Sequence, residues 1–213
     1  MHIVLYGATG QIGQVLLNEA LNRGHEVTAV VRDPARLTLQ HPRLRVRTGD
    51  VGDEAGIVAA TSGADAVIAS LTARRDGNPD VIPGHAERLL GLLPKAGVKH
   101  LLWIGGAGSL EVAPGVRLVD TPTFPPAYLA EARSQAEALA VFRASRPGLD
   151  WTFFSPAALI EPGERTGHYR LGGDQLLTDA EGVSRISIAD FAMAVLDRAE
   201  RRDALNRRVT VAY

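Results

Sequence analysis

The chain has 213 residues, of which 46% are hydrophobic and 22% are charged, with a formal net charge of −1 and no cysteine. This composition is typical of one soluble globular domain with a sizeable core, rather than of a disordered or fibrous protein. A charge balance near zero, with arginines scattered along the chain, argues against nucleic acid as a partner. The absence of cysteine excludes disulfides, thiol catalysis and thiolate metal sites.

Targeting signals are also missing from the sequence. The first apolar strand starts at His2, which leaves no room for the charged and apolar regions of a signal peptide. No apolar run approaches the roughly 18 residues that a membrane-spanning helix needs. We therefore expect a cytoplasmic protein with no membrane partner.

Short apolar runs rich in β-branched residues alternate with helical patterns along the chain. The runs predict strands at residues 3–5, 27–31, 44–46, 66–69, 101–104 and 151–154, and the helical patterns lie at 11–23, 54–62, 81–96, 126–146 and 189–201. Strands that are apolar on both faces and are separated by helices are typical of a parallel sheet covered on both sides. The predicted fold class is therefore α/β, with a doubly wound, Rossmann-like parallel sheet in three layers, forming a single domain over residues 1–213.

The first strand leads directly into three glycines, Gly7, Gly10 and Gly13. Gly7 would let the chain turn sharply, Gly10 would let the backbone approach a pyrophosphate, and Gly13 would let the next helix pack closely. The spacing is one residue wider than the usual dinucleotide fingerprint, and the alternative is a plain packing turn. Because free N–H groups at a helix start favour an anion, we interpret this segment as a nucleotide-binding loop. Its other candidate cofactor contacts are Thr9, Gln11 and Ile12.

The end of the second predicted strand indicates which cofactor is preferred. Sites specific for NAD normally place Asp or Glu there, but this chain places Arg32, followed one turn later by Arg36. A guanidinium group is always charged and binds phosphate bidentately, so these residues suit the 2′-phosphate of NADP. The sequence thus predicts NADP(H) over NAD(H). The alternatives are a solvated arginine, or one paired with Asp33.

Two long segments interrupt the alternation, residues 105–125 and 156–184, and both are rich in proline and glycine. Loops of this length in a compact domain are usually functional or disordered. We expect both to be irregular segments over the carboxyl edge of the sheet, where ligands of such sheets bind, and to form the acceptor site.

Together these features resemble the atypical short-chain dehydrogenase/reductase families, and within them the NAD(P)H-flavin reductase group. The likeness lies in residues 7–13, 30–37, 49–51, 64–68, 85–93, 97–108, 154–167 and 184–190. The chain is similar also to the biliverdin/flavin reductases and to the NmrA-like NADP(H) sensors.

The resemblance assigns further cofactor contacts. It implies that Asp50 and Val51 contact the adenine and that Pro156 lies near the nicotinamide. It also implies that the segment 70–73 contacts the riboses, with Ser70, Leu71 and Thr72 as the candidates. The alternatives are a turn after a strand, a proline that ends a strand, and a plain connecting loop.

The chain departs from the family where the usual reductase chemistry lies. Typical members use a tyrosine with a lysine four residues later, which lowers the pKa of the phenol. No tyrosine here has that partner, because the only lysines are Lys95 and Lys99. The expected catalytic serine is replaced by glycine within residues 105–108. Ser109 lies further along and would either turn into the site or satisfy its own backbone. No catalytic residue is assigned.

The missing acid narrows the chemistry. Hydride transfer to a carbonyl needs an acid for the alkoxide, whereas a flavin ring delocalises the charge. The sequence predicts an NAD(P)H-dependent oxidoreductase that acts on a flavin-like or quinone-like small molecule, with flavin as a substrate rather than a tightly bound group. Candidate acceptor contacts are Phe124, Tyr128 and Tyr169, which would otherwise be loop anchors.

Two other functions remain open. One is a non-catalytic NADP(H) sensor that acts on a protein partner, and the less favoured one is an epimerase-like or dehydratase-like enzyme. We expect no metal, because the six histidines never occur three or four residues apart.

Overall fold

The computed structural model describes residues 1–73, 78, 80–145 and 148–213. The strands of its central sheet are β1 (His2–Tyr6), β2 (Glu26–Val31), β3 (Leu44–Thr48), β4 (Ala66–Ala69), β5 (His100–Ile104), β8 (Asp150–Pro156), β10 (Arg170–Gly172) and β12 (Arg207–Ala212). The α-helices are α1 (Gln11–Asn22), α2 (Glu54–Thr61), α3 (Val81–Leu92), α4 (Leu129–Ala144) and α5 (Ile188–Arg201). Two small sheets pair β9 (Leu159–Glu161) with β11 (Arg185–Ser187) and β6 (Glu111–Ala113) with β7 (Val116–Arg117).

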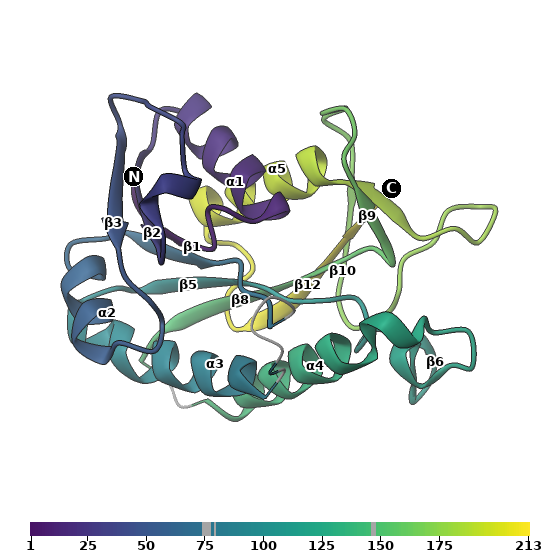
Figure 1. The fold of residues 1–213 in the computed structure, drawn as a ribbon. Coiled ribbons are helices and arrows are strands. Elements are labelled where there is room, and N and C mark those ends of the chain that lie inside the picture. Colours follow the sequence, from purple (N-terminus) through teal and green to yellow (C-terminus); the bar gives the residue numbers. More distant parts are fainter. Residues whose placement is uncertain (74–77, 79, 146–147) are drawn as a thin grey trace.

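The central sheet has the strand order β10-β12-β8-β5-β4-β1-β2-β3. Its strands run parallel except β10, which pairs antiparallel with β12. Helices α1 and α5 cover one face, and α2, α3 and α4 cover the other (Figure 1). The predicted doubly wound α/β fold is therefore confirmed. None of the helices formed by the described residues is long and apolar enough to cross a membrane.

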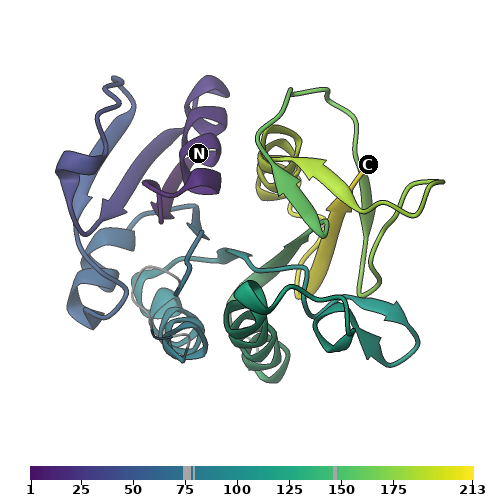
Figure 2. The same cartoon turned by 45° about the vertical axis from the view of Figure 1, so that its right-hand side comes forward.

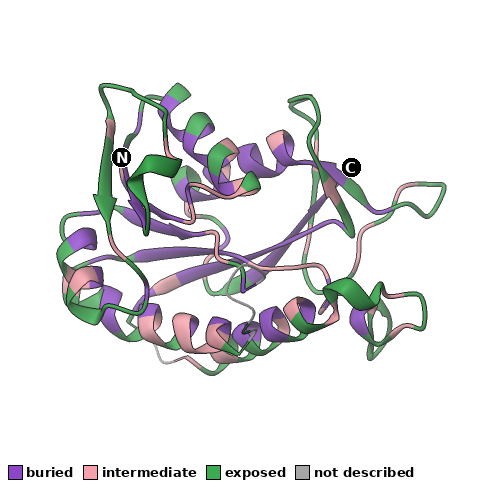
Figure 3. Ribbon diagram, in the orientation of Figure 1, coloured by how far each residue is buried: buried purple, intermediate pink, exposed green. Residues whose placement is uncertain are grey.

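The double covering explains why the strands are apolar on both faces. In β5, Leu102 and Ile104 pack into the core shared with α1 and α5, whereas Leu101 and Trp103 pack into the core shared with α3 and α4. Figure 3 shows the inner strands buried along their length, with exposed residues on the outer sides of the helices.

Sequence reasoning missed the last strand, β12, and the expectation that both long segments are irregular was wrong. The segment 105–125 contains the β6–β7 hairpin, and 156–184 contains β9 and β10. β12 begins with two arginines, which is unusual for a buried parallel strand, but its residues 207–211 pair with β8 and every residue after Arg207 is buried. The sheet therefore has two more strands than predicted.

Helix boundaries follow local chemistry. The pattern predicted at 81–96 divides into α3 and a 3-10 helix, Leu93–Ala96, because Pro94 cannot continue an α-helix. The first helical turn predicted from residue 126 is likewise a 3-10 turn, Pro126–Tyr128, before α4. The helix start predicted at Ser187 is confirmed, since its hydroxyl accepts a bond from the Asp190 N–H at 3.0 Å.

His100 opens β5 and is fully buried, with Nε2 3.1 Å from the Thr152 hydroxyl. The pKa of the imidazole is lowered to about 4, chiefly by burial and also by the nearby charge of Arg202, while the charge of Asp150 acts in the opposite direction. The neutral ring is therefore the form that the folded state accepts.

We expect folding stability to fall as the pH drops from about 6.5 to 4, because the unfolded chain takes up the proton first. The loss reaches about 2 kcal/mol at pH 5. Urea unfolding at pH 7 and pH 5 measures it, with His100→Gln as the control that lacks the titrating group. Equal losses in both proteins would contradict this assignment.

Candidate functional site

The glycine loop after β1 rests on the loop after β4. Gly7 has a φ of +83°, and a Cβ built on it would lie 1.9 Å from the Ser70 carbonyl oxygen. A Cβ on Gly13 would lie 2.0 Å from the Gly7 carbonyl oxygen, so α1 also packs directly on this loop. Both glycines are required by backbone contacts within the protein.

Gly10 is different, because the nearest atom to an added Cβ is the Gly7 carbonyl oxygen at 3.3 Å and the space beyond is open. Its carbonyl accepts the first helical bond, from the Gln14 N–H at 2.9 Å. No side chain caps the start of α1, and its first turn carries no acidic residue. The backbone N–H groups of Gln11, Ile12 and Gly13 are thus offered to an anion, which fits a pyrophosphate.

Arg32 directly follows β2, and its Nε lies 3.9 Å from Oδ2 of Asp50, with both side chains about half exposed. The structure thus brings together two predicted contacts that are far apart in the sequence. Asp33 caps the short 3-10 turn instead, where it accepts from the Ala35 N–H at 3.1 Å. Arg36 lies exposed in that turn.

The turn after β3 holds Asp50 and Val51, the two residues assigned to adenine. Asp50 Oδ1 accepts from the Gly52 N–H at 2.6 Å, and the carbonyl of the buried Val51 accepts from Arg88 at 3.3 Å. Gly49 donates its N–H to the Val31 carbonyl at 3.0 Å, which fixes this turn beside the end of β2.

The segment after β4 is held by α4. The Leu71 carbonyl accepts from Gln135 Nε2 at 3.2 Å, and the Ala73 N–H donates to Glu131 Oε2 at 3.0 Å. Thr72 between them is exposed. Ser70 donates its N–H to the Tyr6 carbonyl at 3.0 Å, next to the glycine loop. Residues 74–77, which follow, lie outside the described part of the chain.

Sequence reasoning missed Glu131 and Gln135. The Trp103 indole N–H donates to Gln135 Oε1 at 3.0 Å, so the amide nitrogen must point at Leu71 and at Glu131 Oε1, 3.3 Å away. Their spacing of four on one helix face was the available signal, because a buried amide requires partners.

Glycines occupy the expected serine position for a packing reason. A Cβ on Gly108 would lie 2.6 Å from the Ala132 Cβ, and one on Gly105 would meet the Phe153 ring at 2.1 Å. Ala132, the residue four positions after Tyr128, therefore packs closely against Gly108. The Ser109 hydroxyl accepts a bond from Arg208 at 2.9 Å, so it is held by β12.

The three aromatic candidates do not form one group. Tyr128 is 47% exposed at the amino end of α4, and Phe124 is half-buried in the segment that precedes it. Tyr169 packs against the core of the opposite face, and its hydroxyl donates to Asp197 in α5 at 2.5 Å. This bond ties the loop that carries Tyr169 to α5. Pro156 is buried at the end of β8.

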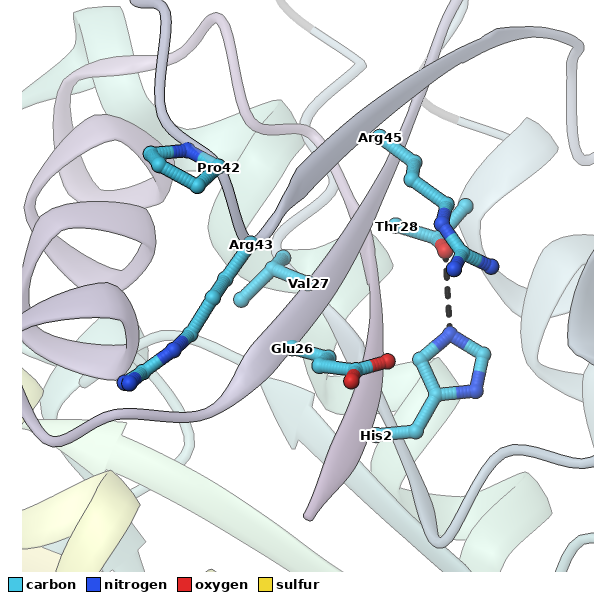
Figure 4. Close-up of a pocket in the computed structure, with 7 residues that line it drawn as sticks. All are labelled: His2, Glu26, Val27, Thr28, Pro42, Arg43 and Arg45. Atoms are coloured by element: carbon cyan, nitrogen blue, oxygen red, sulfur yellow. Dashed lines mark hydrogen bonds between the residues drawn. The ribbon is translucent and has the colours of Figure 1, made fainter.

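A small hollow of about 70 Å³ lies at the other end of the sheet. It is lined by the starts of β1, β2 and β3, where the His2 ring nitrogen lies 2.9 Å from the Thr28 hydroxyl (Figure 4). It is too small for a dinucleotide and lies away from the glycine loop. The described residues include no cluster of His, Asp and Glu side chains that could hold a metal ion.

A parallel sheet whose first strand, glycine loop and helix leave backbone amides open at the carboxyl edge defines a Rossmann-type nucleotide-binding protein. Comparison with known sequences agrees, because residues 7–199 match the NAD(P)H-binding family. The chain therefore belongs to this family.

Solved structures share the fold over the whole chain, including the three that follow. A Burkholderia pseudomallei protein named as a putative exported protein is 42% identical, with a TM-score of 0.90 and complete coverage of both chains. A putative epimerase from Bacteroides thetaiotaomicron is 41% identical, with a TM-score of 0.92, covering 100% of this chain and 96% of its own. A putative NADH-flavin reductase from Streptococcus pneumoniae TIGR4 is 33% identical, with a TM-score of 0.84, covering 100% and 99%. These three names imply different functions, so the function of this chain has to be argued from its own site.

Proposed function

We propose that the protein is an NAD(P)H-dependent oxidoreductase that transfers hydride to a flavin-like or quinone-like acceptor. One observation carries the proposal. The space beside Gly10 is open for a pyrophosphate at the carboxyl edge of the sheet, and the described residues offer no tyrosine–lysine pair there. Lys95 and Lys99 both precede β5 and so belong to the opposite end of the sheet.

In this proposal the chain holds the cofactor in four places. The amides of residues 11–13 bind the pyrophosphate, and Arg32 with Arg36 binds the 2′-phosphate. Asp50 and Val51 contact the adenine, and the segment 70–72, held by Glu131 and Gln135, contacts the riboses. NADPH supplies the hydride when it is bound.

The kind of acceptor is proposed from the absence of an assigned acid or base at the carboxyl edge of the sheet. A carbonyl substrate, or an epimerisation, needs an acid or base within hydrogen-bond reach of the reacting atoms. The hydroxyls proposed near the acceptor are those of Ser109 and Tyr128, and Ser109 is bound to Arg208. A flavin or quinone tolerates this because its reduced ring is protonated by water, which favours the reductase over the epimerase.

The second candidate function is a non-catalytic NADP(H) sensor with a protein partner. The absence of a tyrosine–lysine proton donor favours this function as well, since a sensor needs only to bind the nucleotide and not to catalyse a reaction.

Anaerobic oxidation of NADPH with FMN tests the proposal. Because no side chain supplies a proton, Ser109→Ala and Tyr128→Phe should each change turnover by less than about tenfold, whereas removing a general acid costs about 10²–10⁴-fold. Tyr128→Ala should instead raise the KM for the acceptor through loss of a stacking surface. A loss beyond about 10²-fold in Tyr128→Phe would show a proton-donating reductase.

A further inference from the structure

The two long segments predicted to form the acceptor site contact each other. Glu111 donates its N–H to the Asp174 carbonyl at 2.9 Å, and its own carbonyl accepts from the Leu176 N–H at 2.9 Å. Glu111 also forms a parallel bridge with Gln175. The β6–β7 hairpin of the first segment therefore rests on the residues that follow β10 in the second. In Figure 2 the teal hairpin lies at the lower right, away from the C-terminus.

A buried cation lies at this junction. Arg208, the second residue of β12, has a side chain that is only 3% exposed. Its Nε donates to the Asp174 carboxylate at 2.8 Å, and Nη2 donates to the Asp174 carbonyl at 3.1 Å. Its Nη1 donates to the Ser109 carbonyl at 3.1 Å and hydroxyl at 2.9 Å. One planar guanidinium thus binds both segments, and a lysine, with three donors on a single atom, could not make all four of these bonds.

The contact at Ser109 reaches the rest of the first segment. Leu118 donates its N–H to the Leu110 carbonyl at 2.8 Å, and Val119 donates to the Gly108 carbonyl at 2.8 Å. The chain thus folds back on both sides of Ser109 before it continues to Phe124. A shift of Ser109 would move this whole segment.

The arginine side chain is the less replaceable partner. Asp174 is 52% exposed and also binds Arg143 at 2.5 Å, so water and a second cation can satisfy it. Arg208 is buried, and its N–H groups are directed at these partners. A hollow of about 520 Å³ adjoins Arg208 and its partners. Because the N–H groups of the guanidinium are already bound within the protein, Arg208 has no unused donor to offer to a molecule in this hollow.

We propose that Arg208 is a positioning residue, which couples the two segments into one unit and thereby sets the affinity for the hydride acceptor. The proposal rests on the proposed function, because it takes the acceptor site to be built from these segments.

Hydrogen–deuterium exchange tests the coupling without any assay of activity. In Arg208→Met and Arg208→Lys, the amides of Glu111 and Leu176 should exchange at least about tenfold faster, whereas those of β1 and β5 should not change. Arg207→Ala, an exposed neighbour on the same strand, should leave all of them unchanged. Unchanged exchange, or faster exchange in one segment alone, overturns the coupling. If the Met variant does not fold, the Lys variant decides.

The effect on affinity is then measured by kinetics and calorimetry. Arg208→Lys should raise the KM for the acceptor about tenfold while the Kd for NADPH stays the same. Faster exchange with an unchanged acceptor KM overturns the positioning role. If the wild-type protein reduces no acceptor, the proposed function fails and the acceptor role of Arg208 fails with it, while the exchange result still decides whether the segments are coupled.

Discussion

Gly10→Val should abolish the binding of both NADPH and NADH and leave a folded protein. The new side chain would point into the open space beyond Gly10, where the one neighbour of an added Cβ among the described residues is the Gly7 carbonyl oxygen at 3.3 Å. It would therefore block the approach of a pyrophosphate to the amides of α1 without entering the core. Calorimetric titration measures the loss, and circular dichroism with thermal melting checks the fold.

Gly91→Val is the matched control, because Gly91 lies exposed in α3 with nothing within 4 Å of an added Cβ. It should bind both nucleotides like the wild type. Gly7→Val should instead fail to fold well, since its added Cβ would meet the Ser70 backbone at 1.9 Å. Unchanged NADPH binding in a native-like Gly10→Val protein would show that the loop does not hold the cofactor.

Arg32→Ala should remove most of the preference for NADPH over NADH. A charge-assisted contact to the 2′-phosphate is worth about 1.5–3 kcal/mol, or about one to two decades in affinity. NADH lacks that phosphate, so its Kd should barely change. Stability should also barely change, because the ion pair with Asp50 is long, at 3.9 Å, and half exposed.

Calorimetry with both nucleotides on both proteins measures this preference, with Arg45→Ala as a control, since Arg45 lies on β3 and lines the hollow at the other end of the sheet. Equal affinities of the wild type for NADPH and NADH would contradict the role of Arg32. A smaller loss in Arg36→Ala would place that residue as the secondary contact.

The cofactor half of the fold could be predicted because its signals are local. The strand, the three glycines and the following helix are adjacent in sequence, and Gly7 and Gly13 are required by contacts that the pattern implies. Arg32 and Asp50 were each assigned separately, and parallel pairing of β2 and β3 brings them together.

The acceptor half could not be predicted because its contacts are distant in sequence. Arg208 binds Ser109, which lies 99 residues earlier in the chain. Helical and strand periodicity relate only residues that are close in sequence, so they could not predict this pair. Tyr169 was grouped with Phe124 and Tyr128 because all three were predicted to come from the two long loops. The sequence did not show that its hydroxyl would bind Asp197 on the other face. Short strands within these loops depend on such pairings and carry no periodic signal of their own.

Direct hydride transfer is the central claim, and NADPH deuterated at the transferred position tests it. With FMN under anaerobic conditions, we expect the absorbance of NADPH and that of the oxidised flavin to fall at the same rate, and the deuterium to slow both. NADPH that binds tightly but keeps its absorbance with every flavin and quinone would contradict the reductase and show a sensor instead.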